Sequence, residues 1–437
     1  MNDNSMRSAP ILRDAVSPYG LASISLALFL IAWLFPPGLY SSVMHERDLL
    51  FLEPQTFLFY LLCVAGFAAG FWIVCPKVIP MEVPTLKTRI PGLLFLMLPL
   101  LFGMVQVARG FQQAFHNNPS LIEIMINQQA QDLKGVDSNN DMALLMNAAP
   151  GLVALIWWTM WRYWQLQLRG WKANAVRFML VSAVLMATSA AILMVSRNQI
   201  MEMVAGMTVL YTLHREAEGR LSWRFIGTVA SCLALGVTLL FGLFSFLRGS
   251  MSLDAQLNLL LGYSGASYNR LAALILGRLH YPFAGRGVYL SPFLSMNEPL
   301  HRIVPLQHVF RWPGFFDEWT SEFGAVERAG LNGSMIFLGT FGFIFCDLGW
   351  FTPLWLMGYG IIYGGLWRSV RHSGVVGVLL YPFAAFCVLL WFGTNLLLDS
   401  WVIPFIRYAL LLLVYEWFTT EKYAPPSFEV SSQPSIL

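Results

Sequence analysis

Apolar stretches that approach or reach the length of a membrane span recur along this chain, separated by short polar segments. A spanning helix needs about 20 mostly apolar residues. Ten stretches meet this description, namely residues 19–37, 56–74, 90–108, 143–161, 176–195, 198–213, 225–247, 349–367, 375–395 and 402–420. The pattern predicts an all-α polytopic membrane protein with about ten transmembrane helices, and about nine to twelve would satisfy it.

Residues 248–348 interrupt this alternation between the seventh and eighth apolar stretches. Leucines at helical spacing and the absence of proline predict a helix over residues 253–279. Prolines and glycines predict irregular backbone over residues 281–333. Residues 334–345 are apolar but too short to span, so we expect a re-entrant element or half-helix that ends near Asp347, before the eighth span.

The chain is therefore expected to have four parts. Residues 1–247 form an N-terminal transmembrane bundle of about seven spans, and residues 248–348 form one large loop that contains the re-entrant element. Residues 349–420 form a C-terminal transmembrane bundle of about three spans. Residues 421–437 form a tail that we expect to be disordered.

Composition supports a membrane protein and excludes several other classes. Hydrophobic residues make up 57% of the chain and charged residues 12%, whereas soluble domains carry roughly 25% charged residues. The net charge of +3 is too small to indicate nucleic-acid binding. The five cysteines have no metal-ligand spacing. Pro36-Pro37-Gly38 follows the first apolar stretch in place of a small-residue cleavage pattern, so we expect an uncleaved anchor.

The short loops predict the orientation of the chain in the membrane. With the N-terminus inside, the short segments on that side hold 15 lysines and arginines, and those on the other side hold four. The four are Arg47, Arg109, Lys134 and Arg197. Because positive charge concentrates on the cytoplasmic side, both termini are expected in the cytoplasm and residues 248–348 on the outer side of the membrane.

The large loop has arginine as its cationic residue and excludes lysine. Between residues 248 and 334 the chain has seven arginines and no lysine. They are Arg248, Arg270, Arg278, Arg286, Arg302, Arg311 and Arg328. The planar guanidinium fork binds phosphate and carboxylate through paired hydrogen bonds, whereas lysine offers a point charge. Aromatic residues run between these arginines, so we interpret the loop as a binding surface for a phosphate-bearing and sugar-bearing substrate.

Further charged residues lie within or beside the apolar stretches. Arg407 lies inside the last one, about 12 Å along a helix from Asp399. It either pairs with Asp399, Asp347 or Glu202, or forms the floor of an outward-facing cavity. Arg197 lies at the tip of the hairpin between the fifth and sixth stretches, where it contacts either substrate or lipid headgroups. Arg270 and Arg278, eight residues apart on the expected helix, should point to a similar side.

Motifs that would indicate a cofactor are absent from the sequence. The chain has no P-loop, no dinucleotide-binding glycine pattern and no metalloprotease helix motif. His301 and His308 are seven residues apart, and no partner recurs at zinc-ligand spacing. We therefore expect no metal and no cofactor.

Several short segments resemble those of the bacterial oligosaccharide repeat-unit polymerases, the O-antigen polymerase (Wzy-type) group. The segments are the hairpin Ser196-Arg197-Asn198-Gln199, the Arg248-Gly249 exit into one large external loop, the glycine-rich element over residues 333–349, and Leu398-Asp399-Ser400-Trp401 with Arg407. The related O-antigen ligases have a histidine before the apolar element that follows the loop. Here Leu331-Asn332-Gly333-Ser334 has none, which favours a polymerase and leaves the catalytic base unassigned.

The resemblance implies a glycosyltransferase at the periplasmic face of the bacterial inner membrane, acting on glycans linked to undecaprenyl diphosphate. It also implies a chain-length regulator and a flippase as partners, besides the lipid-linked oligosaccharides and membrane lipid. Arginines would neutralise the diphosphate leaving group, with Arg197, Arg248, Arg270 and Arg278 preferred. The other candidates for that contact are Arg302, Arg311, Arg328 and Arg407. Asp399 and His308 are the candidates for the base that deprotonates the acceptor hydroxyl.

Two other functional classes satisfy parts of the same pattern. One is an O-antigen ligase or another lipid-linked glycosyltransferase. The other is a flippase for lipid-linked glycans. Transporters commonly have duplicated halves with broken helices in matching positions, and the two halves of this chain differ in span and loop lengths. The polymerase remains the preferred interpretation.

Overall fold

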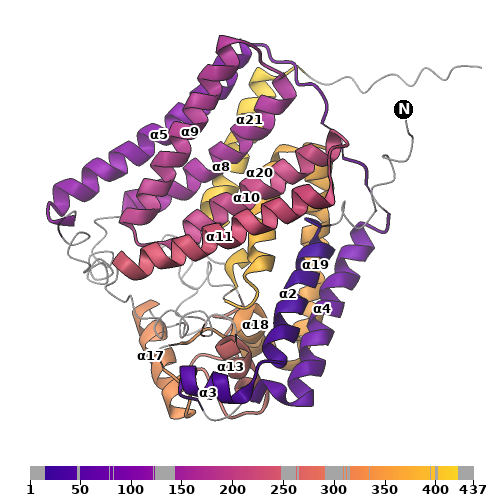
Figure 1. Ribbon diagram of the computed structural model, residues 1–437, viewed down its shortest axis with the longest axis vertical. Helices are drawn as coiled ribbons and strands as arrows, with labels where there is room; N and C mark the ends of the chain where they lie inside the picture. Colours follow the sequence, from indigo (N-terminus) through magenta and orange to yellow (C-terminus); the bar gives the residue numbers. More distant parts are fainter. Residues whose placement is uncertain are drawn as a thin grey trace, which may run out of the picture.

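The computed structural model describes residues 15–46, 50–77, 79–81, 83–121, 123, 143–247, 262, 265–290, 309, 312, 315–333, 335–393, 395–398 and 402–421. Every regular element in these ranges is an α-helix or a short 3-10 helix. One isolated β-bridge joins Thr88 to Thr420. The expectation of an all-α architecture is therefore confirmed for the part of the chain that is described (Figure 1).

The N-terminal part contains α2 (Pro18–Trp33), α3 (Pro37–Met44), η2 (Leu50–Leu52), α4 (Pro54–Val74), α5 (Gly92–Asn117), α8 (Ala143–Leu166), α9 (Trp171–Leu193), α10 (Arg197–Ala217) and α11 (Trp223–Leu247). The remainder contains α13 (Gly265–Ile275), α17 (Phe315–Arg328), α18 (Gly339–Leu348), η3 (Gly349–Phe351), α19 (Thr352–Arg371), α20 (Val375–Leu389), η4 (Leu396–Leu398) and α21 (Val402–Thr419). Each of the ten expected stretches contains one of the long helices.

Seven described helical stretches are long and apolar enough to cross a membrane, which supports a multi-pass membrane protein. One of the seven, Gly339–Arg371, joins α18 to α19. The pair α2 and α3, bent by 92°, would make an eighth. Among the other described helices, α20 has only 15 residues, and α10 carries charged residues along its length. A count of about ten spans therefore stays a prediction.

Helix α8 forms the core of one half of the bundle. Over the most apolar 18 residues of α8, 78% of the residues are buried inside the protein. The corresponding share for α11 is only 11%. The indoles of Trp157, Trp158 and Trp161 are fully enclosed. Helices α5, α9, α10, α20 and α21 all pack against α8 (Figure 1).

Helices α4 and α19 make the most extensive helix–helix contact in the other half of the bundle. Their backbones touch at glycines, as small residues permit between membrane helices. A Cβ atom on Gly70 would lie 1.9 Å from the carbonyl oxygen of Met357, and one on Gly360 would lie 2.1 Å from that of Phe67. The glycines therefore allow an approach that no other residue type would.

We call the end of the bundle where α8, α10, α19 and α21 finish the basic end. Two buried ion pairs join these helices there. Arg162 Nε lies 2.6 Å from Glu416 Oε1, and Arg371 donates from both terminal nitrogens to Glu216 at 2.6 and 2.8 Å. Each of the four helices thus runs in the same direction, as the alternating topology requires.

The opposite end, which we call the loop end, carries α3, η2, α13 and α18, seen at the bottom of Figure 1. The helix expected over residues 253–279 is present as α13 in its described part, but it ends at Ile275. The short element expected over residues 334–345 is present as α18, which begins at Gly339 and runs on to Leu348. Met335 to Leu338 have no helical structure.

Candidate functional site

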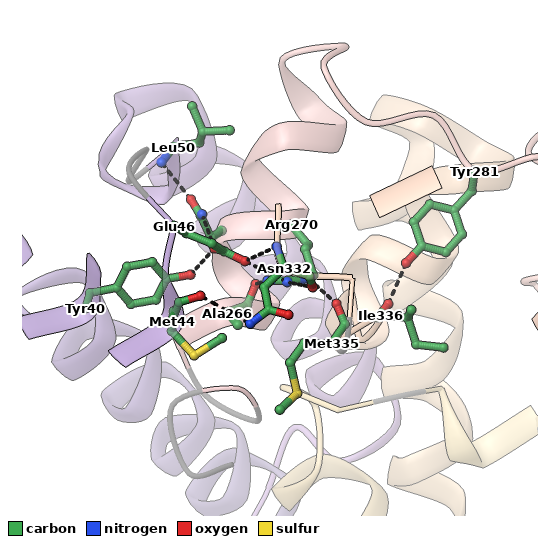
Figure 2. A network of polar contacts seen from close by, with 11 residues as sticks. Tyr40, Met44, Glu46, Leu50, Ala266, Arg270, Tyr281, Asn332, Met335 and Ile336 are labelled. Carbon is green, nitrogen blue, oxygen red and sulfur yellow. Dashed lines mark hydrogen bonds and ion pairs between the residues drawn. The ribbon is translucent and has the colours of Figure 1, made fainter. Parts of the chain in front are cut away.

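A buried ion pair organises the loop end (Figure 2). Arg270 Nη2 lies 2.7 Å from Glu46 Oε1, and the two side chains are 0% and 1% exposed. The second carboxylate oxygen of Glu46 accepts hydrogen bonds from the Tyr40 hydroxyl and from Asn269 Nδ2, the latter at 2.9 Å. Oε1 also accepts from the backbone N–H of Asn332 at 2.9 Å. Both oxygens of this buried carboxylate are thus fully used.

The remaining donors of Arg270 point at backbone carbonyl oxygens. Nη1 donates to Ala266 at 3.0 Å and Nη2 to Asn332 at 2.6 Å, while Nε donates to Met335. A guanidinium that is fully buried and bonded in this way has no surface to offer a ligand. Arg270 therefore holds the loop end together, and this correction removes it from the expected diphosphate contacts.

The same network joins segments that are far apart in the sequence. Asn269 Oδ1 accepts from the backbone N–H of Leu50 at 2.7 Å, and Asn332 Nδ2 donates to the carbonyl of Met44. The Tyr281 hydroxyl donates to the carbonyl of Ile336, and burial raises the pKa of Tyr281 far above its ordinary value, so the donor proton is retained. Residues 40–46 and 50, α13, and residues 331–333, 335 and 336 form one connected layer (Figure 2).

A second carboxylate fixes the backbone that follows α13. Asp347, near the end of α18, accepts from the N–H groups of Gly285 and Gly287 at 3.0 Å each and from that of Leu290 at 2.8 Å. Successive backbone N–H groups that converge on one carboxylate form an anion-binding concavity. Here the protein's own Asp347 occupies it, so this carboxylate orders residues 285–290 and is not paired with Arg407.

Arg278 lies beyond the end of α13. Gly277 has a φ of 68°, and the N–H of Arg278 bonds back to the carbonyl of Ala273 at 2.8 Å, which closes the helix as C-terminal glycines commonly do. Arg278 is exposed whereas Arg270 is buried. The prediction that the two arginines point to a similar side is therefore wrong, because the helix ends between them.

Other basic residues of this layer are also exposed. Arg286 follows the Asp347 contact, its carbonyl accepts a hydrogen bond from Trp312 Nε1 at 2.7 Å, and its guanidinium lies 5.5 Å from the ring of Phe283. Arg328 ends α17 and is exposed, as is His280. The loop end thus presents guanidinium and imidazole groups beside aromatic rings.

The first turns of α10 contain a polar cluster within the bundle. Arg197 begins the helix after a tight turn at Val195, as the hairpin prediction required, and its guanidinium lies 4.6 Å from the ring of Phe241. Gln199 and Glu202 are 5% and 2% exposed, and Oε1 of each accepts no hydrogen bond from the described part of the chain. We name Arg197, Gln199 and Glu202 the α10 cluster.

Buried acceptor oxygens without donors are costly, and an ionisable group in a membrane bundle commonly has a function. Sequence reasoning considered Glu202 only as an ion-pair partner of Arg407. What it missed is that Glu202 is buried in the first turns of α10, as Arg197 and Gln199 are. The spacing of Gln199 and Glu202, three residues apart and so on one side of the helix, was the available signal.

Arg407 is exposed on α21, and no described residue forms an ion pair with it. Its neighbours on the same face, Leu410, Leu411 and Val414, are exposed and apolar. Since the helix begins at Val402, the Cα atom of Arg407 lies about 8 Å along the helix axis from that end. Pairing with Asp347 or Glu202 does not occur, and Arg407 instead faces outward from the bundle.

The other predicted residues lie outside the described part of the chain. They are Arg248, Arg302, Arg311, His308 and Asp399. Their assignments to diphosphate contact and to the catalytic base remain predictions. In the described ranges, no group of three or more histidine, cysteine, aspartate and glutamate side chains could hold a metal ion.

Comparisons of the chain with protein-family models, with curated proteins and with solved structures give no match. The described candidates for contact with an anionic substrate are Arg197, Arg278, Arg286, Arg328 and Arg407, and Glu202 is the described candidate for proton transfer.

Proposed function

We propose that this protein polymerises oligosaccharide repeat units carried on undecaprenyl diphosphate, at the periplasmic face of a bacterial inner membrane. The observation that carries the proposal is that the arginines at the loop end differ in burial. Arg270 is buried and bonded to Glu46, whereas Arg278, Arg286 and Arg328 in the same layer are exposed. A layer held rigidly on the bundle with arginine forks on its surface suits recognition of a lipid diphosphate.

The proposed reaction is a glycosyl transfer between two lipid-linked glycans. The acceptor hydroxyl attacks the anomeric carbon of the growing chain, and the bond from that carbon to the diphosphate oxygen breaks. The diphosphate leaves with the electron pair, and guanidinium groups stabilise the negative charge that develops on it. The hydroxyl proton passes to a base, for which the candidates are Glu202, Asp399 and His308.

Depth in the bundle also supports a lipid-linked substrate. Arg197 and Glu202 lie in the first turns of α10, and Arg407 lies on the outward face of α21 near its start. A substrate with a diphosphate at headgroup level and a polyprenyl tail in the bilayer would meet cations at this depth. A soluble sugar nucleotide would not require a cation on a lipid-facing helix surface.

The test is a deletion of the corresponding gene in its host, followed by electrophoresis of surface polysaccharide and extraction of carrier lipid. The proposal expects single repeat units to persist and all longer chains to disappear. Loss of every capped species would instead indicate a ligase, and carrier-linked units confined to the inner leaflet would indicate a flippase. Either of those two outcomes contradicts the polymerase.

Reconstitution separates direct from indirect effects. Purified protein in liposomes receives a synthetic repeat unit on undecaprenyl diphosphate, and the products are resolved by mass. Formation of dimers and longer chains, with release of undecaprenyl diphosphate, is the expected result. A transfer to a non-carrier lipid acceptor alone would support the ligase and exclude the polymerase.

A further inference from the structure

A small cavity lies at the basic end, where α2, α4 and α19 meet. Its volume is about 150 Å³. Tyr19 of α2 lines it, as do Trp72 and Lys77 from α4 and the residues just after it, and Trp367 and Arg371 of α19. None of the residues that line the cavity is acidic. The lining is therefore cationic, although Arg371 is itself paired with Glu216, which does not line the cavity.

Arg371 brings a buried guanidinium to the cavity wall. It is 2% exposed, and its two terminal nitrogens donate to Glu216 at 2.6 and 2.8 Å. Its guanidinium carbon lies 5.0 Å from the centre of the Trp367 ring. These contacts hold Arg371 and Trp367 in place on one side of the cavity.

Two further cations add positive charge without an acidic partner. Lys77 and Arg368 are exposed, and neither forms an ion pair with any described residue. Burial raises the pKa of the Cys75 thiol, while the charge of Arg368 lowers it, and Cys75 also lines the cavity. The charge of Arg368 thus acts at the cavity wall. The site combines Lys77 on the cavity wall with the nearby charge of Arg368, and no described acidic residue pairs with either, a combination that favours an anion.

The rim of the cavity is apolar and faces outward. Trp72 is 62% exposed and Ile73 is 57% exposed, both in the last turn of α4. Exposed tryptophan at the end of a spanning helix is typical of the level of lipid headgroups. Basic pockets between membrane helices bind anionic headgroups. A free inorganic anion has no apolar part that could contact this rim, whereas a lipid has acyl chains that could.

We propose that the cavity binds the phosphate of an anionic membrane lipid, with Lys77 and Arg368 as its charge partners. The acyl chains of the lipid lie against Trp72 and Ile73. This site is at the opposite end of the helices from the arginine-bearing loop end. It is independent of the proposed transfer reaction.

Native mass spectrometry of the purified full-length protein tests the proposal. Delipidated protein in detergent is titrated with phosphatidylglycerol or with phosphatidylcholine of the same acyl chains. Wild type should retain phosphatidylglycerol preferentially. Lys77→Gln should weaken that binding about fivefold, since a basic residue at a membrane surface contributes roughly that factor. A second change, Arg368→Gln, should weaken it about fivefold again.

Lys172→Gln is the matched control, because Lys172 is an exposed lysine that does not line the cavity. It should bind phosphatidylglycerol as wild type does, and all variants should share one thermal midpoint in phosphatidylcholine. Equal retention of the two lipids by wild type, or unchanged binding by Lys77→Gln, overturns the proposal. Displacement of bound lipid by millimolar inorganic phosphate would assign the cavity to a free anion and likewise overturn it.

Discussion

Glu46 and Arg270 are 224 residues apart in the chain, yet their side chains meet at 2.7 Å within the interior of the loop end. The pair joins the first short loop to the helix that lies within the large loop. A buried pair of this kind often contributes less to stability than apolar residues would, but removing one partner is strongly destabilising. Its effect here is to specify how the large loop sits on the bundle.

Replacement of Glu46 by Gln should destabilise the loop end by about 3–5 kcal/mol. The reason is that the buried Arg270 guanidinium keeps its charge and loses its counter-ion. Limited proteolysis of the purified protein, with fragments mapped by mass, measures the opening of this layer. Faster cleavage between residues 265 and 333 is expected, with α8 to α11 unaffected.

Arg328→Gln is the control for this change, because Arg328 is an exposed arginine in the same layer. Its cleavage pattern should equal that of wild type. The double replacement Glu46→Gln with Arg270→Met removes both charges and should recover part of the lost protection. If Glu46→Gln alone leaves cleavage unchanged, the network does not hold the layer.

A second prediction concerns the contact between α4 and α19. Gly360→Ala places a methyl group 2.1 Å from the Phe67 carbonyl oxygen and must separate the two helices. Overpacking of this kind costs about 1–3 kcal/mol, so the thermal midpoint should fall. Gly358→Ala, on the same helix, meets nothing within 4 Å and should leave the midpoint unchanged. Equal midpoints for both variants would refute the close contact.

Hydrophobic pattern was sufficient to predict the long helices, because each apolar stretch encodes its own helix. The prediction of irregular backbone over residues 281–333 was wrong for Phe315–Arg328, which form α17. The prolines and glycines lie on either side of this helix, which has a single glycine, Gly324. The pattern also located the short helix before α19, since Gly339 to Leu348 is too short to be a span. It did not distinguish Arg270 from Arg278, because residue type does not reveal burial. The partner of Arg270 is Glu46, and no local periodicity relates two residues in different loops.

The orientation of the chain is open to a direct test by cysteine labelling. A background with Cys232→Ser removes the exposed cysteine, and the other four are buried. In that background His280→Cys should react with an impermeant maleimide added to intact spheroplasts, whereas Lys87→Cys should react only after lysis. Both positions are exposed. Labelling of position 280 only after lysis would place the arginine-bearing layer in the cytoplasm and remove the basis of the proposed function.

If the exposed arginines bind the diphosphate through paired hydrogen bonds, lysine should not replace them although it keeps the charge. Arg278→Lys and Arg328→Lys keep the positive charge but lose the paired donors that bind a diphosphate. Both side chains are exposed, so the fold should persist. Polymer formation in liposomes should fall about tenfold or more for each variant, as loss of one charge-assisted hydrogen bond implies. Retention of full polymer length and rate in both variants would exclude these arginines from the substrate contacts.

The α10 cluster gives the sharpest separation of stability from activity. Glu202→Gln keeps the volume of the side chain and removes its ability to take up a proton. Because Glu202 Oε1 has no partner, the amide costs the fold little, and the thermal midpoint should stay within a few degrees of wild type. Loss of a positioned acid–base group should lower the transfer rate about 100-fold or more.

Thr159→Val is the matched control, since Thr159 Oγ1 is also buried without a partner among the described residues but lies on α8, outside the α10 cluster. That variant should keep both midpoint and rate. Full activity of Glu202→Gln would return the role of base to Asp399 or His308.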